Sequence, residues 1–190
     1  MWGRGWSRVR LGLGNHPRRL PEIVQFSFPT SIGFGVGVRR HIPEALQQVG
    51  CSKPLLVTDS ALAKLPVISD LVVLLEDSGL KTTVFSDMAG NPVESQVTAG
   101  VEAFKSSGSD SVLAVGGGAP IDVAKAIALM AHHPGDLFDY EDGREDGRPV
   151  DKELPYLIAV PTTAGTGSEV GRSAVISEDD THIKRIIFSP

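Results

Sequence analysis

Three consecutive glycines, Gly116 to Gly118, lie between the apolar segment SVLAV and the helix-like segment PIDVAK. Glycine lets the backbone approach a ligand, and the first turn of a helix offers unpaired N–H groups at the positive end of its dipole. Such a turn suits a pyrophosphate group. It matches neither the G-x-G-x-x-G pattern nor a P-loop, and a tight strand-to-helix turn would need the same glycines for packing alone.

A second stretch rich in glycine and hydroxyl groups, PTTAGTGSE, follows the apolar segment YLIAV. Its residues Thr162, Thr163 and Thr166 can donate and accept hydrogen bonds at short range. A solvated linker would have a similar composition. We expect this stretch to face the glycine turn, because the two strands that lead into these segments are predicted to be neighbours in one sheet.

Two acidic residues accompany these loops. Asp59 ends the segment LLVTD, where a carboxylate can accept both hydroxyls of an adenosine ribose and repel a 2′-phosphate, which favours NAD over NADP. Its alternative role is to cap the following turn, DSALA. Asp122 and Lys125 are three residues apart on one helix face, so they either act at the site or form a surface ion pair.

The segments that position these residues alternate between strand and helix patterns. Strands are predicted at KPLLVTD, KTTVFSD, SDSVLAV and YLIAV, and helices at IPEALQQVG, PVISDLVVLLEDSGL, NPVESQVTAGVEAFKSSG and APIDVAKAIALMAHH. This alternation predicts an α/β fold with a Rossmann-like, mainly parallel sheet and helices on both faces, whose ligands bind at the carboxyl ends of the strands. FSFPTSIGFGVGV is predicted to form edge strands or a hairpin, and residues 139–153 a solvated loop.

The composition is that of a globular protein, with 190 residues, 41% apolar and 22% charged. A net charge of −5 argues against nucleic acid and anionic membranes as partners, and every apolar run is far shorter than the roughly 20 residues of a membrane span. The single cysteine, Cys51, fits a reducing compartment, so we expect a cytoplasmic protein.

The N-terminal residues differ from the rest of the chain. The first 21 residues hold five Arg and no acidic residue. We predict that residues 1–24 form a tail that is disordered or targets the protein to an organelle, and that residues 25–190 form one dinucleotide-binding domain.

The order VTD, NP, GGGAPIDVAK and PTTAGTGSE, with its intervals, resembles the iron-containing, metal-dependent alcohol dehydrogenases of the dehydroquinate-synthase-like superfamily. The resemblance runs from about residue 25 to the last residue. It implies an oxidoreductase that passes hydride between a small alcohol and NAD, giving an aldehyde or ketone. The cofactor-binding residues that we expect on this basis are Asp59, Asn91, Gly116, Gly117, Gly118, Ala119, Asp122, Thr162, Thr163, Thr166 and Lys184.

The resemblance also implies roles for these residues. The glycine turn and Ala119 would hold the NAD pyrophosphate, Asn91 would lie near it, and the threonines would line the nicotinamide-side ribose and phosphates. Lys184 matches a family lysine near the cofactor. Family members usually have Ser where this chain has Ala119, so one hydroxyl contact to phosphate is missing here.

In the family, Fe²⁺ or sometimes Zn²⁺ polarises the substrate oxygen, held by an Asp and three His of an all-helical second domain. The resemblance places that domain just past the last residue of this chain. The five histidines do not replace those ligands, since His132 and His133 are adjacent and the others are isolated. We therefore expect no catalytic or metal-binding residue here, and a cofactor-binding portion that is inactive alone. An uncovered face would favour homo-oligomers or a partner chain.

Three alternatives remain open from the sequence. The first is another reaction of the superfamily, such as polyol oxidation or maleylacetate reduction. The second is a nucleotide-binding module without catalytic activity. The third is a truncated gene product that has no role.

Overall fold

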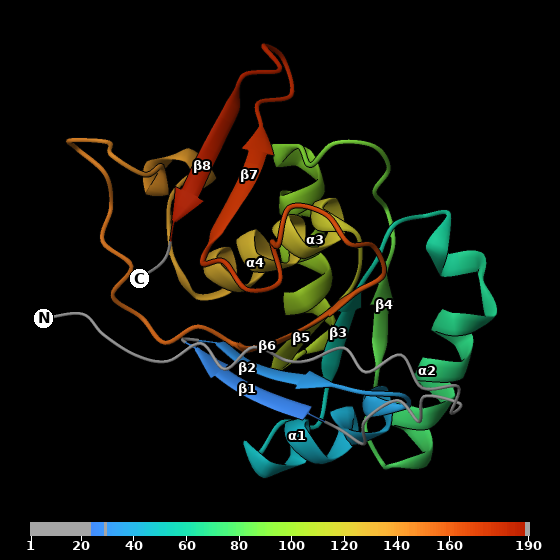
Figure 1. Cartoon of the computed structure of the whole chain (residues 1–190). Helices are drawn as coiled ribbons and strands as arrows, with labels where there is room; N and C mark the ends of the chain where they lie inside the picture. Colours follow the sequence, from blue (N-terminus) through green and yellow to red (C-terminus); the bar gives the residue numbers. More distant parts are fainter. Residues whose placement is uncertain (1–23, 29, 189–190) are drawn as a thin grey trace, which may run out of the picture. The chain divides into compact units, whose positions relative to one another are not determined.

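A four-stranded parallel sheet organises the computed structural model, which describes residues 24–28 and 30–188. The strands lie in the order β4-β3-β5-β6 (Figure 1). Their bounds are Pro54–Val57 for β3, Thr83–Phe85 for β4, Ser111–Gly116 for β5 and Tyr156–Pro161 for β6. Strands β5 and β6 pair from Ser111 opposite Tyr156 to Gly116 opposite Pro161. The predicted parallel sheet and the predicted neighbouring strands are confirmed, so the carboxyl ends of all four strands lie at one edge.

Four α-helices connect and cover the strands. Their bounds are Ile42–Gln48 for α1, Pro66–Asp77 for α2, Glu94–Ser107 for α3 and Gly118–His132 for α4. Short 3₁₀ turns lie at Val38–His41, Leu62–Lys64 and Leu137–Tyr140. Helices α1, α2 and α3 lie within segments where the apolar spacing and the Pro and Gly boundary residues predict a helix, and α4 begins one residue before its predicted segment, at Gly118.

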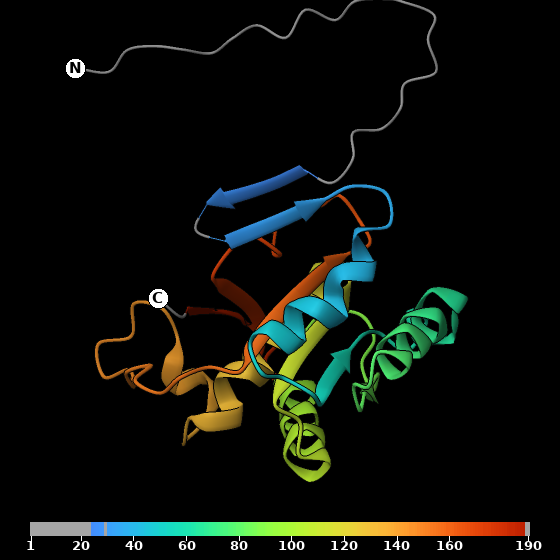
Figure 2. The same cartoon turned by 90° about the horizontal axis from the view of Figure 1, so that it is seen from below.

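The two faces of the sheet carry separate apolar clusters, because successive side chains of a strand point to opposite faces. Val112 and Ala114 of β5 pack with buried residues of α3 and α4. Leu113 and Val115 of the same strand pack with buried residues of α1 and α2. Figure 2 shows α1 and α3 on opposite sides of the strands. The expectation of helices on both faces is therefore confirmed.

Helices α3 and α4 approach each other closely at a glycine. A Cβ atom added to Gly100 would lie 2.2 Å from Cδ1 of Ile127, which is a clash with a buried side chain. The absence of a side chain at Gly100 thus allows α3 to pack closely against α4. Helix α4 is the helix that begins at the glycine turn.

Two antiparallel hairpins complete the described part of the chain. The contacts divide the chain into two units, Met1–Val36 and Gly37–Pro190. In the first unit, β1 (Val24–Phe28) pairs with β2 (Thr30–Phe34), as the edge-strand pattern predicts. In the second unit, β7 (Ser173–Ser177) pairs with β8 (Lys184–Phe188), an element that the sequence did not reveal.

The N-terminal tail and the solvated loop at residues 139–153 were also predicted from the sequence. Residues 1–23 of the predicted tail lie outside the described residues, and the division at residue 24 stays a prediction. Most of the predicted solvated loop is exposed, and within it Arg148 Nε donates to Asp139 Oδ2 at 2.9 Å. Among the described residues, no helix has the length and apolar character needed to cross a membrane.

Candidate functional site

The glycine turn joins β5 to α4 in a conformation that requires glycine at its first position. Gly116 has φ of 153°, and a Cβ atom there would lie 2.7 Å from Cγ of Pro120. Gly117 is the N-cap of α4, and the helix begins at Gly118. The N–H groups of the first helical turn have no carbonyl partner one turn earlier, so they can donate to a ligand at this end.

The hydroxyl groups of the second loop lie against the glycine turn. The backbone N–H of Thr162 donates to the carbonyl of Gly116 at 2.9 Å. A Cβ atom on Gly117 would lie 3.3 Å from Thr163 Oγ1, and one on Gly118 would lie 3.2 Å from Thr166 Oγ1. Side chains at these two glycines would therefore press on the hydroxyl groups. The absence of side chains leaves backbone donors and hydroxyl groups facing the same space.

Asp59 uses one of its two oxygens to form the turn that follows β3. Its Oδ1 accepts hydrogen bonds from the N–H groups of Ala61 at 3.0 Å and Leu62 at 2.8 Å. The alternative turn-capping role is therefore real. Its Oδ2 has no hydrogen-bond partner within the described residues, so this oxygen keeps its full capacity to accept from a ligand.

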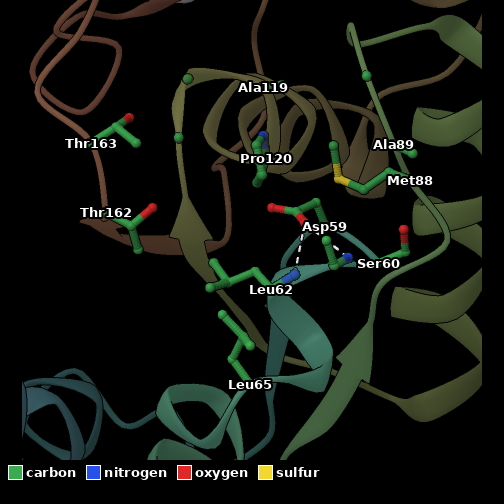
Figure 3. Close-up of a pocket in the computed structure, with 14 residues that line it drawn as sticks. Asp59, Ser60, Leu62, Leu65, Met88, Ala89, Ala119, Pro120, Thr162 and Thr163 are labelled. Carbon is green, nitrogen blue, oxygen red and sulfur yellow. Dashed lines mark hydrogen bonds between the residues drawn. The ribbon is translucent and has the colours of Figure 1, made fainter.

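A cavity of about 670 Å³ opens between these loops (Figure 3). This volume is typical of small-molecule sites, which span roughly 300–1,000 Å³. All four parallel strands contribute to its wall: 59–62 and Leu65 after β3, 88–90 after β4, 117–120 after β5, and 162–163 at the end of β6. We call it the strand-end cavity. It lies where ligands of parallel α/β sheets bind.

Six of the predicted cofactor-binding residues line the strand-end cavity. They are Asp59, Gly117, Gly118, Ala119, Thr162 and Thr163. Five others do not line it: Gly116, Asn91, Asp122, Thr166 and Lys184. Asn91 follows the lining residue Gly90, Thr166 lies against Gly118, and Lys184 is the first residue of β8.

The sequence did not reveal the apolar part of the cavity wall. Leu62, Leu65, Met88 and Ala89 line the cavity, and Figure 3 shows Met88 and Ala89 across it from Thr162 and Thr163. Leu65 is half exposed, at 51%, although its side chain is large and apolar. Met88 and Ala89 belong to DMAGNP, which follows a predicted strand, but their side chains have the pattern of ordinary loop residues and gave no sign of an apolar wall. Together the apolar side chains offer a surface on which a planar ring can lie.

Asp122 and Lys125 meet at Ser168 of the second loop. The Ser168 hydroxyl donates to Asp122 Oδ1 at 2.5 Å and accepts from Lys125 Nζ at 3.1 Å. Lys125 Nζ also donates to the carbonyls of Ser168 and, at 2.9 Å, Ser173. The two charged groups are thus joined through a serine from a distant loop, whereas the sequence predicted either a role at the site or a surface ion pair. Burial lowers the pKa of Lys125, and the carboxylates of Asp122 and Glu169 oppose that shift.

The histidines and carboxylates of the described residues do not assemble into a metal centre. No three His, Cys, Asp or Glu side chains come together there in a way that could hold an ion. His133 is buried, where its Nδ1 contacts the carbonyl of Leu129 at 2.9 Å and its Nε2 accepts from the N–H of Lys152 at 3.1 Å. This side chain fastens the loop before β6 to the end of α4.

The comparisons with known proteins agree with the resemblance in the sequence. The family model described as "Iron-containing alcohol dehydrogenase" matches residues 29–190. A choline dehydrogenase of Bacillus subtilis (strain 168) is 38% identical over 161 residues, which are 84% of this chain and 39% of the relative. A 4-hydroxybutyrate dehydrogenase of Cupriavidus necator is 40% identical over 154 residues, 80% of this chain and 39% of that protein.

Solved structures of similar proteins share the fold. The structure of a 1,3-propanediol oxidoreductase superposes with a TM-score of 0.75 at 35% identity, covering 82% of this chain and 40% of that one. The chain thus spans about 40% of the length of the relatives that it matches. The family match over most of the sequence and the shared fold lead to one conclusion: this chain belongs to the iron-containing alcohol dehydrogenases.

Proposed function

We propose that the strand-end cavity binds NAD and that the chain is the cofactor-binding portion of an NAD-dependent, metal-dependent alcohol dehydrogenase. One observation carries this proposal. A glycine turn at a helix N-terminus and a carboxylate with a free oxygen face the same cavity of about 670 Å³. The first group suits a pyrophosphate and the second a ribose, and a dinucleotide contains both.

In this proposal the two halves of the cofactor occupy two parts of the cavity. Asp59 Oδ2 would accept from the adenosine ribose hydroxyls, and its negative charge would repel the 2′-phosphate of NADP. The apolar side chains of Leu62, Leu65 and Met88 also line the cavity and would contact the adenine ring.

The pyrophosphate would lie on the glycine turn and accept from the N–H groups of Gly118 and Ala119. Thr162 and Thr163 would donate from the other side to phosphate or to the nicotinamide ribose. Thr166, Asn91 and Lys184 remain proposed contacts beyond the cavity wall. Because Ala119 replaces a hydroxyl-bearing side chain, the backbone donors would hold the phosphate without it.

The relatives support an alcohol as the substrate class and a nicotinamide as the cofactor. The names of the relatives include choline, 4-hydroxybutyrate and 1,3-propanediol dehydrogenases, and a structural relative from Thermotoga maritima at 34% identity is described as an NADH-dependent butanol dehydrogenase. Bound nicotinamide supplies the hydride acceptor. The named substrates differ, so we propose only the substrate class, a small alcohol that is converted to its aldehyde or ketone.

The described residues do not bring together a set of side chains that could hold the metal of the family. We propose that these 190 residues bind NAD but do not oxidise alcohol alone, because the resemblance assigns the metal ligands to sequence outside them. A nucleotide-binding module without catalytic activity would use the same cavity, so the experiment has to separate binding from turnover.

The test is an NADH fluorescence assay on the purified chain with NAD, Fe²⁺ or Zn²⁺, and butanol or 1,3-propanediol. NAD binding is followed in parallel by calorimetry. We expect saturable NAD binding without alcohol-dependent NADH formation. Alcohol-dependent NADH that a chelator abolishes would contradict the proposed inactivity, and loss of NAD binding itself would contradict the proposed site.

A further inference from the structure

We call residues 162–171, the second loop, the Gly/Thr loop. It carries exposed hydroxyl groups, and side chains of helix α4 form hydrogen bonds to it. Thr162, Thr163 and Thr166 are exposed, whereas Ser168 is half buried. Two backbone hydrogen bonds join residues of the loop to each other: the N–H groups of Val170 and Gly171 donate to the carbonyl of Gly167. A glycine-rich loop of this kind has many accessible conformations, so its position depends on what attaches it to the rest of the fold.

Lys125 provides that attachment from the second turn of α4. Its ammonium group has three protons, and the structure shows three acceptors for them: the carbonyl of Ser168, the hydroxyl of Ser168 and the carbonyl of Ser173. Asp122 accepts from the same hydroxyl at 2.5 Å. We call Asp122, Lys125 and Ser168 the Ser168 anchor. Hydrogen bonds to charged groups are the strong ones, and all three of these residues are partly shielded from water.

Lys125 contacts the chain at two residues, Ser168 before the bend that leads into β7 and Ser173 after it. Ser168 lies at the base of the Gly/Thr loop, and Ser173 is the first residue of β7. The other end of the loop is held by the hydrogen bond from Thr162 to Gly116. Between these attachments the hydroxyl groups of Thr163 and Thr166 lie against Gly117 and Gly118.

We propose that Lys125 is a positioning residue, which through Ser168 holds the Gly/Thr loop where its hydroxyl groups meet the nicotinamide half of the dinucleotide. This inference rests on the proposed NAD site. Without the anchor the loop samples other positions, and the apparent affinity falls in proportion to the fraction of loops that remain in place. The adenosine half would bind to Asp59 and to apolar side chains of other segments, so its affinity should not depend on this loop.

The test compares Lys125→Met with Lys105→Met. Both changes remove one positive charge, but Lys105 is exposed in the last turn of α3. Dissociation constants for NAD and AMP are measured by calorimetry on the full chain. Lys125→Met removes all three hydrogen bonds from Lys125 Nζ, so we expect it to weaken NAD about tenfold or more and AMP less than about twofold. Lys105→Met should leave both constants within about twofold of the original. Equal losses for NAD and AMP in Lys125→Met would overturn the assignment, since they would indicate general loosening of the fold.

Hydrogen exchange of the unliganded chain tests the anchor without a nucleotide. In Lys125→Met we expect the amides of residues 163–171 to exchange about tenfold faster, while those of β5 keep their protection. Unchanged exchange of the loop in a folded variant would overturn the proposal. If the original chain fails to bind NAD, the proposed function fails, and the exchange result still decides whether Lys125 holds the loop.

A milder variant covers the case in which Lys125→Met does not fold. Ser168→Ala removes the hydroxyl group and keeps both carbonyl acceptors of Lys125. Two hydrogen bonds of the hydroxyl are lost, to Asp122 and Lys125, but the carbonyl contacts of Lys125 still hold the loop. We therefore expect Ser168→Ala to weaken NAD about threefold and to leave AMP unchanged. Unchanged NAD affinity in this variant would overturn the proposal.

Discussion

Asp59 and Asp110 lie at opposite ends of the same parallel sheet, and the fold treats their carboxylates differently. Asp110 precedes β5, where its two oxygens accept from the N–H groups of Ser52 at 2.7 Å and Lys53 at 3.0 Å and from the hydroxyl groups of Ser52 and Ser111. Asp59 follows β3, where one oxygen accepts from two N–H groups and the other accepts from none within the described residues. Only Asp59 lines the strand-end cavity.

This difference separates a residue that stabilises the fold from one that remains available to a ligand. At the amino end of the sheet, the protein's own backbone satisfies the carboxylate. Burial alone would raise the pKa of Asp110, but the hydrogen bonds from Ser52, Lys53 and Ser111 outweigh it, so the pKa is lowered. At the carboxyl end, acceptor and donor groups are left unused around a cavity, as in a binding site.

The largest predicted effect comes from placing a new carboxylate in the cavity. Gly117→Asp should weaken NAD about 100-fold or more, because the side chain would press on Thr163 Oγ1 and bring like charge to the pyrophosphate. Calorimetric titration measures the change. The control is Gly117→Ala, which adds only the methyl group and should cost about tenfold or less. Full NAD affinity in Gly117→Asp would show that the pyrophosphate does not lie on this turn.

The next effect concerns the free oxygen of Asp59. Asp59→Asn can keep the amide oxygen as acceptor for Ala61 and Leu62 and replaces only the unused oxygen by a donor. We expect NAD to bind about tenfold more weakly and the discrimination against NADP to disappear. Asp110→Asn is the matched control and should leave NAD affinity within about twofold. A preference for NAD that survives in Asp59→Asn would remove Asp59 from the proposed ribose contact.

In stability the two variants should rank the other way round: Asp110→Asn should lose more free energy of unfolding than Asp59→Asn. Asp110→Asn replaces one acceptor oxygen by a donor that faces backbone N–H groups, so we expect a loss of about 1–2 kcal/mol in the free energy of unfolding. Asp59→Asn should lose less than about 0.5 kcal/mol, because the hydrogen bonds of its turn remain. Urea unfolding measures both. Similar losses in the two variants would contradict the contrast between the two ends of the sheet.

The smallest predicted effect is the pH dependence of the stability that the Asp110 carboxylate contributes. Because the pKa of Asp110 is lower in the folded chain than in the unfolded chain, its stabilisation is fully present above the unfolded pKa and is lost as the pH falls through the folded pKa. The stability gap between the original chain and Asp110→Asn should therefore be constant near neutral pH and shrink below about pH 4. A gap that stays constant into acid would exclude the ionised carboxylate as its cause.

The sequence was informative where local pattern decides structure. Alternating apolar strands and helices predicted the parallel sheet, and the glycines of 116–118 predicted the sharp turn into α4. The position of Asp59 in the wall of the strand-end cavity could be predicted because it directly follows a strand. These features depend on neighbouring residues, so a single sequence contains them.

Features that depend on distant segments could not be predicted. The Ser168 anchor joins residues that are 43 positions apart or more, and the spacing of Asp122 and Lys125 suggested only a shared helix face. The apolar wall of the cavity brings Leu65 and Met88 together from two different loops. The β7–β8 hairpin was missed because it follows the glycine-rich loop and leaves Val175 and Ile186 partly exposed. Only the packing of the whole unit reveals these contacts.

The most direct test of the account is a calorimetric titration of the purified chain with NAD and then with NADP, with and without Fe²⁺ or Zn²⁺. If the strand-end cavity is a dinucleotide site that Asp59 makes selective, NAD binds saturably, NADP binds more weakly, and the metal changes neither constant. Absence of NAD binding up to about millimolar nucleotide, which corresponds to less than roughly 4 kcal/mol of binding free energy, would contradict the account.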